Sequence, residues 1–125
     1  MNRLEQSELF LKRLEKYSDE VYALCKQVKY DSIVNEILLQ LSRSSSSPGA
    51  NYIEAIESVS SKDFYFRIKI CRKESRESGY WLRRLMVLKP ELVVKCTELE
   101  SESREFVLIF SKILQSQKVN DQMIK

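Results

Sequence analysis

Apolar residues recur in alternating steps of four and three through four successive segments of the chain. Residues spaced in this way lie on one face of an α-helix, and that face packs against other helices. The first two seams are Phe10, Leu14, Tyr17, Val21, Leu24, Val28 and Val34, Leu38, Leu41, Ser45, Pro48, Tyr52, Ala55, Val59. The last two are Phe64, Ile68, Cys71, Ser75, Ser78, Leu82, Leu85 and Leu92, Cys96, Leu99, Ser103, Phe106, Phe110, Ile113.

Few residues interrupt these seams, so the four segments are expected to be long helices. The 125 residues include only two glycines and two prolines, whereas a sheet protein needs a turn about every ten residues. Ser7, Asp31, Ser60 and Pro90 are suitable helix-start residues. We predict one all-α domain, an antiparallel up-down four-helix bundle with long helices at about 7–28, 32–59, 61–88 and 90–116. The polar tail, residues 117–125, is expected to fray.

The second segment passes through a Ser-Pro-Gly stretch that propensity alone would make a loop. Serine competes for backbone hydrogen bonds, and Pro48 has no amide proton to donate. The apolar register nevertheless continues on both sides without slipping. This favours a continuous helix, or one kinked at Pro48, over a broken one.

Serine occupies the middle of the last three seams. Ser45, Ser75, Ser78 and Ser103 would share one layer of an antiparallel bundle. One interpretation is close helix packing, with each hydroxyl bonded to a carbonyl one turn earlier. The other interpretation is a ligand cavity at this waist.

Residues for catalysis and metal binding are scarce. The chain has no histidine, which is the commonest general base and metal ligand. Cys25, Cys71 and Cys96 are far apart and form no Cys-x-x-Cys pair, so they are expected to be small core residues in a reducing compartment. No apolar run could span a membrane, and the first residues do not form a signal peptide. We therefore expect a cytoplasmic protein without membrane contact.

Glutamates on a four-helix bundle raise the question of an enzyme. Glu54, Glu57, Glu74 and Glu77 could face inward, but a di-iron site in such a bundle also uses Glu-x-x-His pairs. The better account of Glu54 and Glu77 is structural, with hydrogen bonds or ion pairs from Arg76, Lys73 or Asn51 at a helix or subunit interface. No catalytic residue, metal ligand, cofactor or small-molecule substrate is expected.

Two motifs carry a resemblance to a known family. The run GANYIEAIESVSSKDF at residues 49–64, followed by KESRESGYWLRRL at 73–85, resembles the 23S ribosomal RNA intervening-sequence protein family of bacterial four-helix bundles. The Tyr-Val-Tyr-Ala pattern at 17–23 is also similar to the family's first helix, so the resemblance covers about residues 8–117. Pro48 and Tyr52 stand where the family has aliphatic residues.

The resemblance implies a non-enzymatic bundle that assembles with itself into a ring, a pentamer. Members are named for genes inside inserts in ribosomal RNA genes. A related branch is similar to the accessory protein of diversity-generating retroelements, which handles nucleic acid.

Charge is distributed unevenly along the chain. Residues 67–89 contain eight basic and two acidic side chains, a balance of +6, whereas residues 91–110 have a balance of −3. A basic face repeated around a ring would bind RNA or DNA, more weakly as salt rises. The candidate nucleic-acid-binding residues are Lys69, Arg72, Lys73, Arg76, Arg83 and Arg84. No aromatic residue is interleaved among them on that face in the pattern of a stacking platform, so sequence-specific readout is not expected.

The competing interpretation pairs the basic third helix with the acidic fourth, within a subunit or across an interface. The chain would then be a structural or protein-interaction module whose charges serve self-assembly. The candidate interface residues are Asn51, Glu54, Glu77, Tyr80 and Trp81. Tyr80 and Trp81 can bury a large area at a subunit contact, or Trp81 can widen the core of its own subunit.

Overall fold

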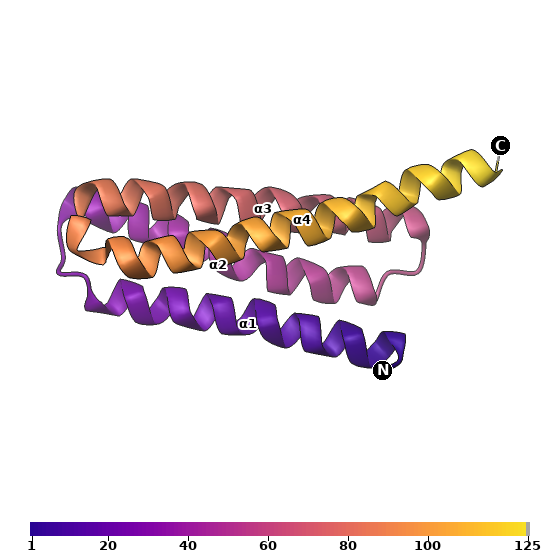
Figure 1. Ribbon diagram of the computed structural model, residues 1–125, viewed down its shortest axis with the longest axis horizontal. Coiled ribbons are helices and arrows are strands. Elements are labelled where there is room, and N and C mark those ends of the chain that lie inside the picture. The colour runs from indigo at the N-terminus through magenta and orange to yellow at the C-terminus, as the bar shows by residue number, and fades with distance from the viewer. Residues whose placement is uncertain (125) are drawn as a thin grey trace.

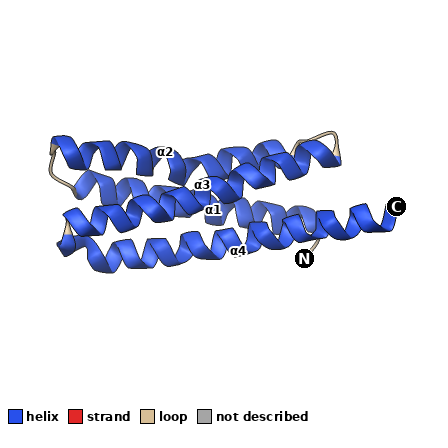
Figure 2. Cartoon of the chain, turned by 90° about the horizontal axis from the view of Figure 1, so that it is seen from above, coloured by secondary structure: helices blue, strands red, loops and turns tan. Residues whose placement is uncertain are grey.

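Four long helices run side by side in alternating directions (Figures 1 and 2). They are α1 (Arg3–Gln27), α2 (Ser32–Ile56), α3 (Ser61–Leu88) and α4 (Val93–Ile124), and a 3₁₀ turn, η1 (Pro90–Leu92), precedes α4. The computed structural model describes the backbone of residues 1–124 and the side chains of residues 1–117. The predicted all-α antiparallel four-helix bundle is confirmed. None of the described helices has both the length and the apolar composition that a membrane crossing requires.

Two helix ends differ from the predicted bounds because other residues cap them. Helix α1 begins at Arg3 rather than at residue 7, since the Asn2 side chain, and not Ser7, accepts a hydrogen bond from the Glu5 amide at 2.8 Å. Helix α2 ends at Ile56, three residues before the predicted 59. Val59 is 97% exposed and therefore no core residue, because the chain must turn there to reach the extended N-cap Ser60.

The fourth helix is longer than predicted. Pro90 starts the η1 turn, and α4 then continues from Val93 to Ile124, past the expected end at 116. The sequence after Pro90 contains no further proline or glycine, so nothing local stops the helix. The last part of α4 extends beyond the ends of the other helices (Figure 1).

The predicted seams form the core. Most of their apolar members are buried, among them Leu14, Val21, Leu41, Ile68, Leu82, Leu99 and Phe110. Rings from three helices meet edge to face near one end, with Phe10 centred 5.1 Å from Tyr52 and 5.5 Å from Phe110. The period of the sequence therefore specified which face of each helix is buried.

Helix α2 passes through Pro48 without a break. The serines before it donate hydrogen bonds to carbonyls of the preceding turn, as Ser44 Oγ does to Gln40 O at 2.8 Å and Ser46 Oγ to Ser42 O at 3.0 Å. Pro48 itself is buried, and its carbonyl accepts from the Cys71 thiol at 3.5 Å. The serine run is thus compatible with helix, and the predicted continuity is correct.

Candidate nucleic-acid interface

The six basic residues predicted to bind nucleic acid share the outer face of α3. Five of them are spaced by three, four or seven residues, and Arg84 lies eleven residues, or three turns, after Lys73. We call this set the α3 basic face: Lys69, Arg72, Lys73, Arg76, Arg83 and Arg84. Five of the side chains are exposed, and Arg72 is half-buried. The structure therefore brings these residues together along one helix.

Three members of this face have a polar partner within the chain. Arg83 Nη1 lies 3.5 Å from Glu100 Oε2, Arg72 Nη1 donates to Ser111 Oγ at 3.4 Å, and Lys73 Nζ lies 3.9 Å from Glu74 Oε1. Lys69, Arg76 and Arg84 form no ion pair with any described side chain. Half of the face is thus without a counter-charge in the described structure.

Two acids of α4, Glu98 and Glu102, pair with groups outside α3. Glu102 receives two hydrogen bonds from Arg13 of α1, at 2.8 and 2.6 Å, and these bonds raise the pKa of the Arg13 guanidinium. Lys95 lies 3.8 Å from Glu20 of α1 and 3.6 Å from Glu98 of its own helix. Within the described side chains, the expected pairing of a basic third with an acidic fourth helix is reduced to one contact, between Arg83 and Glu100.

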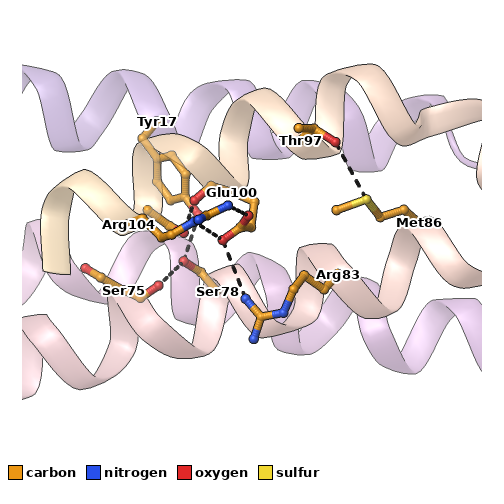
Figure 3. A network of polar contacts seen from close by, with 9 residues as sticks. Tyr17, Ser75, Ser78, Arg83, Met86, Thr97, Glu100 and Arg104 are labelled. Carbon is orange, nitrogen blue, oxygen red and sulfur yellow. Dashed lines mark hydrogen bonds and ion pairs between the residues drawn. The ribbon is translucent and has the colours of Figure 1, made fainter.

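Glu100, the acid in this contact, is buried. Only 5% of it is exposed, and Arg104 on the next turn holds the carboxylate with two hydrogen bonds, Nε to Oε2 at 2.8 Å and Nη2 to Oε1 at 2.7 Å (Figure 3). The carboxylate lines a groove of about 600 Å³ between α3 and α4. Arg76, Arg83 and Arg104 also line this groove, so it carries more positive than negative charge.

Arg104 belongs to this surface, although the sequence analysis did not select it. It lies on α4, whose residues 91–110 have a net negative charge, so a sum of charges along the sequence does not single it out. Its spacing of four from Glu100 was the available signal, because such a pair shares one helix face.

Beneath the groove lies the predicted serine waist, which is held by hydrogen bonds. Tyr17 Oη is 2.7 Å from Ser78 Oγ, and the Ser78 hydroxyl is 2.9 Å from the Ser75 carbonyl (Figure 3). Ser75 Oγ donates to Cys71 O at 2.8 Å, and Ser103 Oγ donates to Glu100 O at 2.7 Å. Burial raises the pKa of the Tyr17 hydroxyl, which keeps it neutral. The bonds agree with the close-packing interpretation.

Gly79 gives α4 room to approach α3 at this waist. A Cβ placed on Gly79 would lie 2.7 Å from Ser103 Oγ, which is well inside ordinary contact distance. The close approach of α3 and α4 thus explains why the motif at residues 73–85 has a glycine at position 79.

Aromatic side chains do lie on the α3 basic face, contrary to the expectation from sequence. Phe66, Lys73 and Tyr80 follow one another at intervals of seven, and the two rings are 58% and 45% exposed. The Tyr80 ring centroid lies 6.0 Å from Arg83 Cζ and 5.7 Å from Arg84 Cζ. The expectation was wrong because the two rings lie in register with Lys73, outside the spacing of four and seven that joins Arg72, Arg76 and Arg83.

The predicted interface residues have different environments. Asn51 is half-buried and links helices of its own subunit, because its Oδ1 accepts from Arg67 Nη1 at 3.1 Å. Glu54 and Glu77 are exposed and form no ion pair with the described side chains, so the partners suggested for them are not observed within the subunit. Trp81 packs against the core, with its ring 4.9 Å from that of Tyr80. Whether these residues contact a second subunit stays a prediction.

The described residues contain no group of three or more histidine, cysteine or acidic side chains that could hold a metal ion. Cys71 and Cys96 are buried, and burial raises the pKa of the first thiol to about 12 and of the second to about 11. These thiols are protonated at neutral pH and poor nucleophiles.

Fold and surface together define an all-α four-helix bundle with a basic outer face. Comparison with solved structures finds the same fold in a protein with unknown function from the S23 ribosomal protein family of Bacteroides thetaiotaomicron. The TM-score is 0.74 and the sequence identity 24%, and the match covers 87% of this chain and 97% of the other. At this identity the likeness establishes the fold, and it is consistent with the resemblance carried by residues 49–85. No protein-family model and no curated protein matches the chain.

Proposed function

We propose that this chain is a non-enzymatic bundle of the 23S ribosomal RNA intervening-sequence type that binds nucleic acid, RNA above all, through the α3 basic face. The observation that carries the proposal is the gathering of six cations on one side of α3, where Lys69, Arg76 and Arg84 form no ion pair with the described side chains. Exposed cations without a counter-charge can take phosphate oxygens at little cost in broken contacts. The fold likeness to a protein of the S23 ribosomal protein family adds support.

Self-assembly into a ring, a pentamer, is part of the same proposal. It rests on the sequence resemblance, and a ring would multiply the basic face. Light scattering on the purified protein measures the mass directly. A monomer would remove this part of the proposal and leave the basic face of the single subunit.

Salt dependence tests the binding. If six phosphates are neutralised on single-stranded RNA, the slope of log K against log salt is about −4, and affinity falls roughly 300-fold between about 50 and 200 mM salt. Replacing Lys69, Arg76 and Arg84 by glutamine removes three contacts. The slope should then fall to about −2 and the loss over the same range to roughly 20-fold.

A matched variant controls for net charge. Lys12, Lys16 and Lys26 are exposed on α1 and form no ion pair with the described side chains. Their replacement by glutamine also lowers the formal charge from +3 to zero, and it should leave the slope near −4. Equal slopes for the two variants would mean that RNA responds to overall charge and not to this face, and absence of binding at about 50 mM salt would refute the proposal.

A structural or protein-interaction module is the second candidate. It is favoured by exposed apolar side chains on the outer face of α2, where Leu39, Ala50 and Ile53 are eleven and three residues apart and so share one side of the helix. A second copy of the chain could cover them. An oligomer that dissociates when Leu39 and Ile53 are replaced by serine, in a protein that does not retain RNA, would favour this function.

A further inference from the structure

Two exposed rings stand among the cations of the α3 basic face, and they restrict the kind of nucleic acid that fits it. Phe66 and Tyr80 are fourteen residues apart, or about 21 Å along the helix, with Lys69, Lys73 and Arg76 between them. Arg83 and Arg84 follow Tyr80 on the next turn. The stripe therefore combines flat apolar surfaces with positive charge, and one exposed acid, Glu77, lies three residues before Tyr80.

We infer that this face takes single-stranded rather than double-stranded nucleic acid, with the rings of Tyr80 and Phe66 as stacking platforms. The inference rests on the proposed function and specifies its substrate class. Bases of a single strand can turn outward and stack on an aromatic side chain, whereas bases of a duplex are already stacked on one another. Phosphates next to the stacked bases would lie beside the arginines and lysines of the stripe.

The contacts of Tyr80 suit this role better than a place in the core. The Tyr80 ring packs against that of Trp81 at 76° between planes, and 45% of Tyr80 stays exposed. The Cζ atoms of Arg83 and Arg84 lie 6.0 and 5.7 Å from the centroid of the Tyr80 ring, close to the limit of about 6 Å for a cation–π interaction. They are therefore close enough to receive a neighbouring phosphate while leaving the ring accessible.

A face that binds through charge alone would not prefer the single strand over the duplex. A duplex presents more phosphates per unit length than a single strand, so a purely electrostatic face would bind the duplex at least as tightly. The comparison of the two forms therefore separates stacking from charge. A suitable probe is an unstructured RNA of adenosine and cytidine, about 16 nucleotides long, used alone and annealed to its complement.

The full-length protein is titrated with both forms at about 50 mM salt, and Tyr80→Leu and Tyr80→Phe are titrated in parallel. We expect the single strand to bind more tightly than the duplex. Tyr80→Leu should weaken single-strand binding about 5- to 100-fold and leave the salt slope unchanged, because it removes a stacking surface and no charge. Tyr80→Phe keeps the ring and should bind as the parent does. Trp81, the only tryptophan, should change its fluorescence with the single strand alone.

Other results would overturn the inference. Equal or tighter binding of the duplex, or single-strand binding unaffected in Tyr80→Leu, would leave charge as the only determinant while the proposed function stands. A lower oligomer mass for Tyr80→Leu, measured by light scattering, would place Tyr80 at a subunit interface instead. Absence of binding for both RNA forms would refute the proposed function itself, and is thus distinguishable from failure of the inference alone.

Discussion

Replacement of Gly79 by alanine tests how closely α3 and α4 approach. Alanine in the interior of a helix normally stabilises it relative to glycine by about 1 kcal/mol. Here the new Cβ would lie 2.7 Å from Ser103 Oγ. That hydroxyl cannot turn aside easily, since Ser103 is 2% exposed and donates to the Glu100 carbonyl at 2.7 Å. Overpacking of this kind costs about 1–3 kcal/mol. We therefore expect Gly79→Ala to destabilise the fold by about 1 kcal/mol.

The second glycine is a matched control within the same protein. Gly49 is also inside a helix, and the nearest atom to its added Cβ is Leu14 Cβ at 4.0 Å, an ordinary contact. Gly49→Ala should therefore gain the usual helix preference and stabilise by about 0.5–1 kcal/mol. In thermal unfolding followed by circular dichroism, Gly79→Ala should melt about 3–5 °C lower than the parent and Gly49→Ala a few degrees higher.

A second substitution at Ser103 isolates the cause. Ser103→Ala removes the oxygen at 2.7 Å, and the nearest remaining atoms to the added Cβ are then the Cβ of residue 103 and Arg83 Nη1, both at 3.7 Å, an ordinary contact distance. In that background the effect of Gly79→Ala on stability should change sign, so that the substitution stabilises the fold. The reasoning fails if Gly79→Ala raises the melting temperature as Gly49→Ala does, or if the Ser103→Ala background does not alter its effect. Either result would mean that the two helices are farther apart at the waist than the 2.7 Å distance to Ser103 Oγ implies.

Three further outcomes follow from the contacts and pKa shifts. Tyr17→Phe should lower the free energy of unfolding in urea by about 1 kcal/mol, because it removes the buried 2.7 Å hydrogen bond to Ser78. The thiols of Cys71 and Cys96, whose pKa values are raised by burial, should resist a disulfide reagent at pH 8 and react promptly once the protein is unfolded. Hydrogen bonds from two amides of the first turn of α2 lower the pKa of Asp31, so its contribution to stability is present above the unfolded pKa and is lost as pH falls through the folded one. On acidification the parent should therefore lose more stability than Asp31→Asn, as measured by urea unfolding at several pH values.

The fold could be predicted from sequence because burial is periodic. Each seam needs only a spacing of four and three, and this spacing persists even where propensity opposes helix, as at Pro48. Helix ends are less predictable because a cap is one residue, and Asn2 and Ser7 are equally suitable as N-caps. The length of α4 was missed for a related reason: polarity was interpreted as fraying, although polar residues such as glutamine and lysine form helix readily.

The candidate site could be predicted only in part. Spacing along α3 is sufficient to place four of the candidate cations on one face, namely Lys69, Arg72, Arg76 and Arg83. The partners of those cations could not be predicted, because they depend on which face of α4 is turned toward α3. Tyr80 is predicted from sequence as a subunit contact and Phe66 has no predicted role, because their place among the cations follows the spacing of the exposed face and not that of the buried seam.

The orientation of α4 explains how an almost neutral protein can present a strongly basic surface. Glu102 faces α1, where Arg13 neutralises it, and Glu100 faces the α3 groove but is held by Arg104 of its own helix. The negative charge of α4 is thus balanced largely by α1 and α4. Salt bridges between exposed groups stabilise a fold little, so this arrangement has a small effect on stability and a large one on where positive charge remains. Under the proposed function, a charge reversal at Arg13 should accordingly affect the α1–α4 contact and leave RNA affinity nearly unchanged, whereas a charge reversal at Arg76 should do the opposite.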